Sequence, residues 1–143
     1  MHEITIEIDS NEDIWKLIDK ESDHIFISNF NPNSSTSWWK TDLKISENQN
    51  LRNISVRNMS VNLQVNLATL KEIIELNTQS LVIYQFAKPI PDTLLVNQLM
   101  EQSKENILIQ NDLKHCFIVN FEFLTIKSFD ENFINDIHKN SII

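Results

Sequence analysis

The 143-residue chain contains no glycine. Glycine allows a positive φ angle and a close approach of the backbone to a ligand, because it has no Cβ. Three well-known loops depend on it: the phosphate loop of nucleotide hydrolases, the Gly-x-Gly-x-x-Gly turn that binds dinucleotides and the Gly-x-Ser-x-Gly nucleophile elbow. The sequence therefore excludes all three of these sites.

Where the fold requires a positive φ angle, this chain must use another residue. Asparagine and aspartate tolerate that conformation better than other residues with a side chain. We therefore expect positive φ angles at positions in predicted turns or at predicted helix ends, which are Asn50, Asn77, Asn106, Asn111 and Asp112.

Hydrophobic periodicity predicts an α+β fold with a mixed or mostly antiparallel sheet of six to seven strands and about four helices. The expected order is β-α-β-β-β-α-β-α-β-β-α. The predicted strands are 4–8, 24–30, 51–56, 61–67, 80–87, 107–110 and 113–123, with a further short strand at 43–46 that could pair with 51–56. The predicted helices are 11–22, 70–77, 92–105 and 129–137, the last with a cap at Ser128.

Length and cysteine usage predict the broad class. A chain of this size fits one domain, which we expect to span residues 1–143. The single cysteine, Cys116, has no partner for an internal disulfide, which favours a reducing compartment. We expect a cytoplasmic protein without a membrane segment, because the N-terminus does not look like a signal peptide and no apolar run is long enough to span a bilayer. Abundant isoleucine and asparagine with scarce alanine and arginine favour an AT-rich gene, which we expect to be bacterial or to come from a phage or a mobile element.

The sequence shows no arrangement typical of catalysis or metal binding. The four histidines are scattered and lack the spacing of metal ligands, so we expect neither a metal nor a cofactor. His115 and Cys116 are adjacent, but neighbouring side chains of a strand point to opposite faces. This pattern predicts a buried, inert cysteine beside a surface histidine. We therefore expect that the protein is not an enzyme.

Negative charge is concentrated near the N-terminus. Residues 1–23 hold eight carboxylates against two lysines and so carry −6 of the formal net charge of −8. Such a surface repels nucleic-acid phosphates and attracts basic proteins. A solvated helix face that only keeps the protein soluble is the alternative. If the surface binds a partner, the steering residues are Glu12, Asp13, Asp19, Glu21 and Asp23.

Three tryptophans are candidates for buried contact with a partner. Trp38 and Trp39 lie in a predicted loop rich in serine and threonine, where they either fold back over the core or form an interaction hot spot. Trp15 lies one position off the apolar stripe of the first predicted helix and could serve as an anchor within the acidic surface.

These features favour a binding protein whose partner is basic. In general character the chain is similar to immunity proteins, which bacteria pair with nuclease toxins. That similarity implies an inhibitor that occludes the active site of a toxin domain or an adjacent surface. Two alternatives are a structural, assembly, phage or host-interaction subunit without catalysis, and a small-molecule-binding protein with a pocket beside the sheet.

Overall fold

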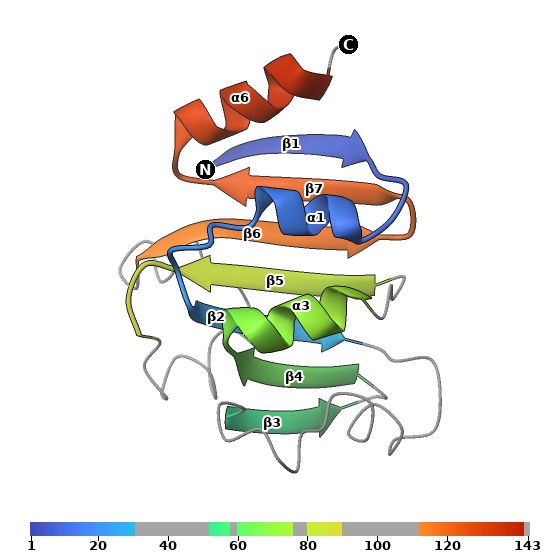
Figure 1. Ribbon diagram of the computed structural model, residues 1–143, viewed down its shortest axis with the longest axis vertical. Helices are drawn as coiled ribbons and strands as arrows, with labels where there is room; N and C mark the ends of the chain where they lie inside the picture. The colour runs from blue at the N-terminus through green and yellow to red at the C-terminus, as the bar shows by residue number, and fades with distance from the viewer. Residues whose placement is uncertain (31–51, 58–59, 76–79, 90–111, 142–143) are drawn as a thin grey trace.

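A computed structural model of the chain describes residues 1–30, 52–57, 60–75, 80–89 and 112–141. Within these residues, seven strands form one antiparallel sheet and three helices pack beside it (Figure 1). The strands are β1 (His2–Glu7), β2 (His24–Phe30), β3 (Arg52–Arg57), β4 (Ser60–Val65), β5 (Ser80–Phe86), β6 (Leu113–Asn120) and β7 (Phe123–Ser128). The helices are α1 (Glu12–Leu17), α3 (Leu67–Glu75) and α6 (Glu131–Ser141).

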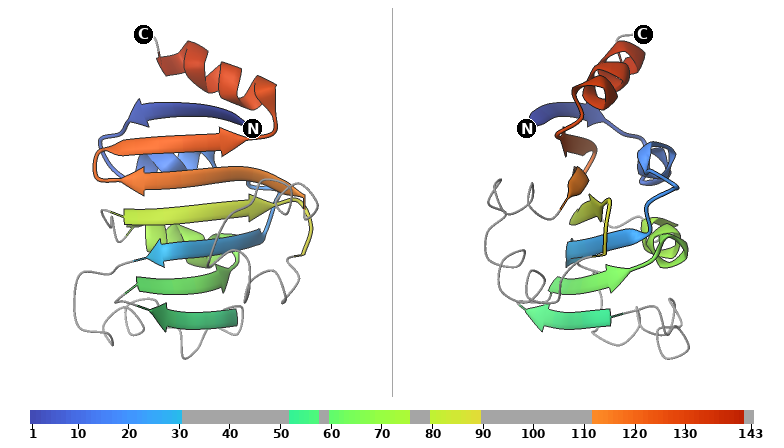
Figure 2. Two further views of the ribbon diagram at one scale, coloured as in Figure 1. Left: turned by 180° about the vertical axis from the view of Figure 1, so that it is seen from behind. Right: turned by 90° about the vertical axis from the view of Figure 1, so that its left-hand side faces the viewer.

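The sheet brings the two ends of the chain together. Its strand order is β1-β7-β6-β5-β2-β4-β3, and every neighbouring pair is antiparallel. The first strand therefore pairs with the last, in a register that runs from His2 opposite Ser128 to Glu7 opposite Phe123. The connection through α1 carries the chain from this edge to β2. Helices α1 and α3 cover one face of the sheet, and α6 lies at the β1 end (Figure 2).

Strand alternation creates a cluster of buried side chains on each face. Neighbouring side chains of a strand point to opposite sides, so the pattern of β2 divides between the two clusters. Ile25 and Ile27 belong to the larger cluster, to which the three helices contribute, whereas Phe26 belongs to a smaller cluster with Tyr84 and Cys116. The helices therefore attach to the sheet through the isoleucine-rich face.

The predicted α+β class with a mostly antiparallel sheet is confirmed, and three of the predicted helices correspond to α1, α3 and α6. Alternation also located β1, β2, β4 and β5 correctly, and each of these strands contributes at least one side chain that belongs to the main cluster or packs against it. The predicted helix at 92–105 and the predicted strands at 43–46 and 107–110 lie outside the described residues.

The prediction of one long strand over 113–123 is wrong. Strand β6 ends at Asn120 and β7 begins at Phe123, so Phe121 and Glu122 form a two-residue turn between paired strands. The alternation of apolar residues continues through this turn, and periodicity therefore did not reveal it. Phe121 has a φ angle of 58°.

Asp112 has a φ angle of 59°, which confirms the prediction for that position. The other four positions at which a positive φ angle was predicted are not among the described residues, and they are Asn50, Asn77, Asn106 and Asn111.

The first helix is shorter than the predicted range of 11–22. It ends at Leu17, because Ile18 has an extended backbone with a ψ angle of 135°. Beyond it, the fully buried Gln85 binds the backbone of Asp19 twice: its Oε1 accepts the N–H at 3.1 Å and its Nε2 donates to the carbonyl at 2.6 Å. Nε2 also donates to the carbonyl of Ser22 at 3.1 Å. These long-range bonds take backbone groups that a longer helix would use itself.

The cap of the last helix is Asp130 and not Ser128. The Oδ1 of Asp130 accepts the backbone N–H of Phe133 at 3.2 Å, as expected at a helix N-terminus. Ser128 is the last residue of β7, and its hydroxyl accepts the N–H of Asp130 at 3.0 Å.

Candidate binding surface

Six of the eight predicted binding residues are described by the structure, and they lie on one short stretch of chain. Helix α1 carries Glu12, Asp13 and Trp15, and the connection to β2 carries Asp19, Glu21 and Asp23. Trp38 and Trp39 fall outside the described ranges.

Asp19 is bound within the protein. Its Oδ2 lies 2.5 Å from the Nζ of Lys114 on β6, and its Oδ1 accepts the backbone N–H of Glu21 at 2.9 Å. The Lys114 hydrogen bond, followed by that of Glu21, holds the pKa of the Asp19 carboxyl below its ordinary value. This carboxylate therefore ties the connection after α1 to the sheet, and its charge is compensated locally.

Two further predicted carboxylates also have internal partners. The Oδ1 of Asp23 accepts the N–H of Leu67 at 2.6 Å, at the first residue of α3. Asp13 accepts the N–H of Asp9 at 3.1 Å and lies 3.6 Å from the ammonium of Lys16. These contacts give both carboxylates a structural role, and among the described residues Glu12 and Glu21 are the predicted carboxylates that are exposed and accept no such bond.

Trp15 is half-buried at the side of α1 and packs against the main core cluster. The Nζ of Lys20 lies 4.5 Å from the centre of its ring, and the Nζ of Lys71 lies 5.8 Å from it. Both distances are within the range of cation–π attraction. The indole is therefore held between the end of α1 and the side of α3.

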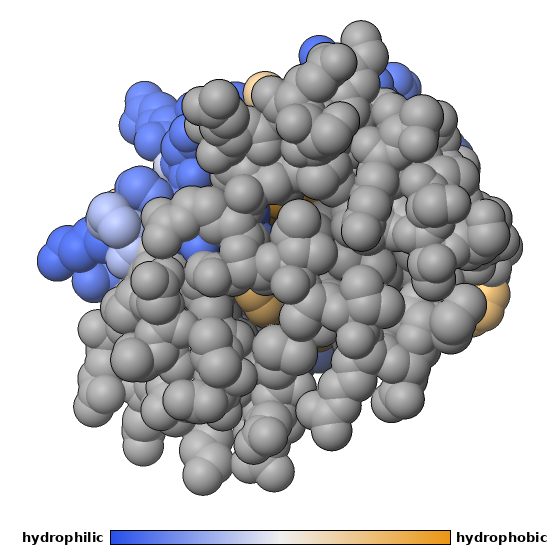
Figure 3. Space-filling model, turned by 90° about the horizontal axis from the view of Figure 1, so that it is seen from below, coloured by the Kyte–Doolittle hydropathy of each residue, from blue (hydrophilic) through white to orange (hydrophobic). Residues whose placement is uncertain are grey.

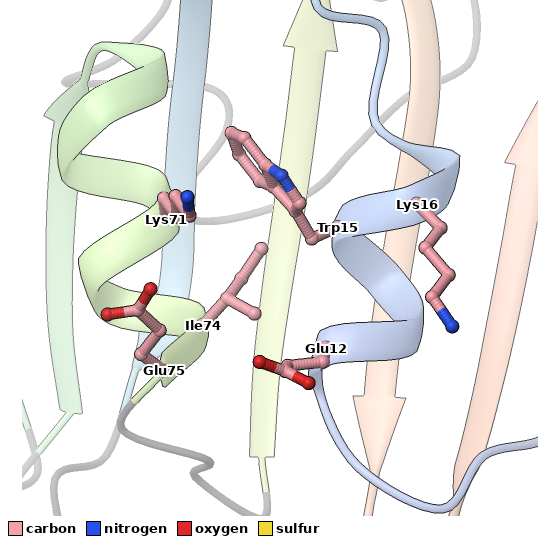
Figure 4. A pocket seen from close by; sticks show the side chains of 6 residues that line it. All are labelled: Glu12, Trp15, Lys16, Lys71, Ile74 and Glu75. Atoms are coloured by element: carbon pink, nitrogen blue, oxygen red, sulfur yellow. The ribbon is translucent and has the colours of Figure 1, made fainter.

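A small groove lies between α1 and α3, next to Trp15 (Figure 4). Its volume of about 140 Å³ suits one side chain and is well below that of a site for a drug-sized ligand. Trp15 and Ile74 provide its apolar surface, and the carboxylates of Glu12 and Glu75 lie near one end, on opposite sides. The lining also includes Lys16 and Lys71.

A second group of carboxylates gathers where β1 leads into α1. The backbone N–H of Ile8 donates to the carbonyl of Glu122 at 2.8 Å, which joins this corner to the β6–β7 turn. The turn and the corner lie at the same side of the sheet (Figure 1). The exposed acidic residues on these two segments, called the acidic corner below, are Glu7, Asp9, Glu12 and Glu122.

Two exposed phenylalanines lie at the acidic corner, and the sequence analysis did not identify them as binding residues. Phe121 is 66% exposed and Phe123 is 47% exposed. Hydrophobic surface projects at the side of the molecule where Figure 1 shows this turn (Figure 3). Both residues fall within the single strand predicted over 113–123. The predicted strand is about twice as long as a usual strand, and this length was the sign in the sequence that a turn lies within it.

His115 and Cys116 are not arranged for catalysis. They belong to opposite faces, as predicted, because His115 packs against Phe117 and Phe133 whereas Cys116 lies in the smaller cluster. The prediction of a surface histidine is wrong, since His115 is buried. Its strand lies inside the sheet, and α6 covers its ring: the rings of His115 and Phe133 stack with centres 3.9 Å apart.

The surroundings of both side chains favour their neutral forms. The Nδ1 of His115 lies 2.9 Å from the Oγ of Ser128, which itself donates to the carbonyl of Lys114 at 2.9 Å. Burial lowers the pKa of the His115 imidazole and raises the pKa of the Cys116 thiol to about 12. A thiol with so high a pKa is a poor nucleophile, because the reactive species is the thiolate.

The described residues contain no group of three or more histidine, cysteine, aspartate or glutamate side chains placed to hold a metal ion. In the same part of the chain, no helix has the length and apolar character needed to cross a membrane. Comparisons with protein-family models, with curated proteins and with solved structures find no match for this chain.

Proposed function

We propose that this chain is a non-catalytic binding protein that recognises a basic protein, and that it acts as an immunity-type inhibitor of a bacterial toxin domain. It would occlude the substrate groove of the toxin or a surface beside it. The chain would supply charge and contact area and no chemistry of its own.

The acidic corner is the observation that carries this proposal. Glu7 and Asp9 flank Ile8, whose N–H bond to the carbonyl of Glu122 joins the start of the chain to the β6–β7 turn, and Glu12 follows at the start of α1. Clustered, exposed carboxylates raise the rate at which a basic partner associates. A basic toxin domain that binds nucleic acid presents the complementary charge.

The groove between α1 and α3 supports the same partner. It opens beside Glu12, and it has room for one side chain of the partner. An arginine or lysine stem could pack on Trp15 and Ile74 while its charged head lies between the carboxylates of Glu12 and Glu75 (Figure 4). Glu12 would therefore contribute both to steering and to direct contact.

The first test is genetic. The gene beside this one should encode a large secreted protein with a basic C-terminal domain, and co-expression of the chain with that domain should protect bacterial cells. The absence of such a gene, or a failure to protect, would overturn the immunity proposal.

A pair of charge-reversal variants then tests the acidic corner. Glu12→Lys with Glu122→Lys should lower the association rate with the toxin domain by about tenfold or more at low salt. The matched control is Glu131→Lys with Asp136→Lys, which makes the same change in net charge on the exposed side of α6. Equal effects of the two pairs would show that only net charge matters, and the proposed surface would be wrong.

A further inference from the structure

We infer that the tip of the β6–β7 hairpin is the apolar anchor of the complex, and that Phe121 inserts into an apolar pocket of the partner whose rim is basic. This inference rests on the proposed function for the sign of the partner's charge. It goes further by naming Phe121 as the residue on which the lifetime of the complex depends, and by describing the pocket of the partner that receives it.

The first argument is exposure. Phe121 and Phe123 are, with Met1, the exposed large hydrophobic side chains of the described residues. Phe121 keeps 66% of its surface in contact with solvent, although the same hairpin buries Phe117 completely. Aromatic side chains that protrude in this way are typical anchors of protein interfaces, because one side chain excludes water from a large area.

The second argument is the backbone conformation. In both favoured types of two-residue hairpin turn, the first central residue has a positive φ angle, and glycine, asparagine or aspartate usually occupies it. The chain has no glycine, yet at Asp112 it uses aspartate for this conformation. At the hairpin tip it places a bulky phenylalanine at a φ angle of 58°. Such a choice is costly for folding and indicates a purpose outside the fold.

The third argument is that the tip is held in place. Asn120 pairs with Phe123 across the turn, and the carbonyl of Glu122 accepts the N–H of Ile8. Strand β7 is paired on both sides, with β6 and with β1. An anchor that is fixed before binding loses little conformational freedom when the complex forms.

The charges around the tip identify the partner. Glu7 lies directly opposite Phe123 in the β1–β7 register, and Glu122 is next to Phe121 in the turn. An apolar pocket would receive the Phe121 ring, and lysine or arginine at its rim would pair with the carboxylates of Glu7 and Glu122. A second copy of this chain carries a formal charge of −8 and would be repelled, as would an anionic lipid surface.

The experiment uses a display library of small three-helix domains with one randomised face, selected against the complete chain. The expected binders combine an apolar depression with lysine or arginine around it. Phe121→Ser should weaken their binding at least tenfold, mainly through faster dissociation, and Glu7→Gln with Glu122→Gln should slow association. Controls are Glu131→Gln with Asp136→Asn on α6, which removes the same number of charges, and thermal unfolding of every variant, for correct folding.

Three results would overturn the inference. Basic binders whose affinity does not change with Phe121→Ser would show that Phe121 is not the anchor, while the proposed acidic surface for a basic partner would stand. Apolar binders without basic residues would contradict both the basic rim and the proposed function. If the selection yields no binder that contacts the hairpin tip, the tip is not a recognition site.

Discussion

The ammonium of Lys114 lies 2.5 Å from the Oδ2 of Asp19 and joins the inside of the sheet to the connection between α1 and β2. The acidic residues of this connection therefore have two different roles. Asp19 and Asp23 bind groups within the protein, whereas the carboxylate of Glu21, between them, accepts no such bond from the described residues. A high density of carboxylates in the sequence does not by itself make every one of them a binding residue.

Replacing Asp19 should destabilise the protein. Asp19→Asn removes the ion pair with Lys114, and since both side chains are partly exposed we expect a loss of about 1 kcal/mol in the free energy of unfolding. The folded-state pKa of Asp19 lies below its unfolded value of 3.8, so its contribution is complete at neutral pH and disappears as the pH falls below 3.8. Urea unfolding at pH 7 and pH 3 measures this, with Glu21→Gln as the control that should change little.

Replacing Gln85 should cost more, because its amide satisfies three buried or partly buried backbone groups. Gln85→Leu removes the partners of the Asp19 N–H and of the carbonyls of Asp19 and Ser22. We expect a loss of about 3 kcal/mol in the free energy of unfolding, since unsatisfied buried polar groups cost about 1–3 kcal/mol each. The control is Ile83→Leu, two positions earlier on the same strand. A loss no greater than that of the control would show that the amide does not hold this connection.

How far the sequence could predict this fold depends on whether the deciding contact was local. Ile25 and Ile27 alternate with polar or oppositely facing neighbours, and a local pattern was enough to locate β2. The end of α1 depends on Gln85, more than sixty positions away, whereas the local apolar stripe of Ile14 and Leu17 runs on to Ile18. The turn at Phe121 was hidden because its apolar side chain keeps the period of a strand.

The candidate site shows the same limit. The sequence correctly placed an exposed glutamate at the start of the first helix, because Glu12 follows a predicted strand and precedes an apolar stripe. It could not show that Glu122 lies at the same corner, since only the pairing of β1 with β7 brings these segments together. Nor could it show that Asp19 is paired with a lysine 95 positions later in the chain.

The buried histidine should make stability depend on pH near neutrality. Burial lowers the folded-state pKa of His115 below 6.5, so the unfolded chain binds a proton in a range where the folded protein does not. Stability should therefore be complete above pH 6.5 and should fall as the pH drops below it, by at most about 1.4 kcal/mol per pH unit. Urea midpoints at pH 7.5, 6.5 and 5.5 measure this dependence.

Two histidine variants identify the group responsible. His115→Gln should lower stability at pH 7.5 and reduce the change between pH 7.5 and pH 5.5. His138→Gln, on the exposed side of α6, should leave that change as it is in the unmodified protein. Loss of the pH dependence in the His138 variant instead would contradict the assignment to the buried imidazole.

The hairpin tip leads to a prediction of increased stability. Phe121→Asn places a residue that tolerates a positive φ angle where the backbone has a φ angle of 58°. Little packing is lost, because the Phe121 side chain is 66% exposed, and we expect a gain of about 1 kcal/mol in the free energy of unfolding. The control is Phe123→Asn, which should give no gain because that position is extended and paired in β7. If Phe121→Asn proved destabilising, the phenylalanine would be needed within the fold, and the argument that it is retained for a partner would fail. If the variant is more stable and binds the basic partner more weakly, the protein sacrifices stability at this position for recognition.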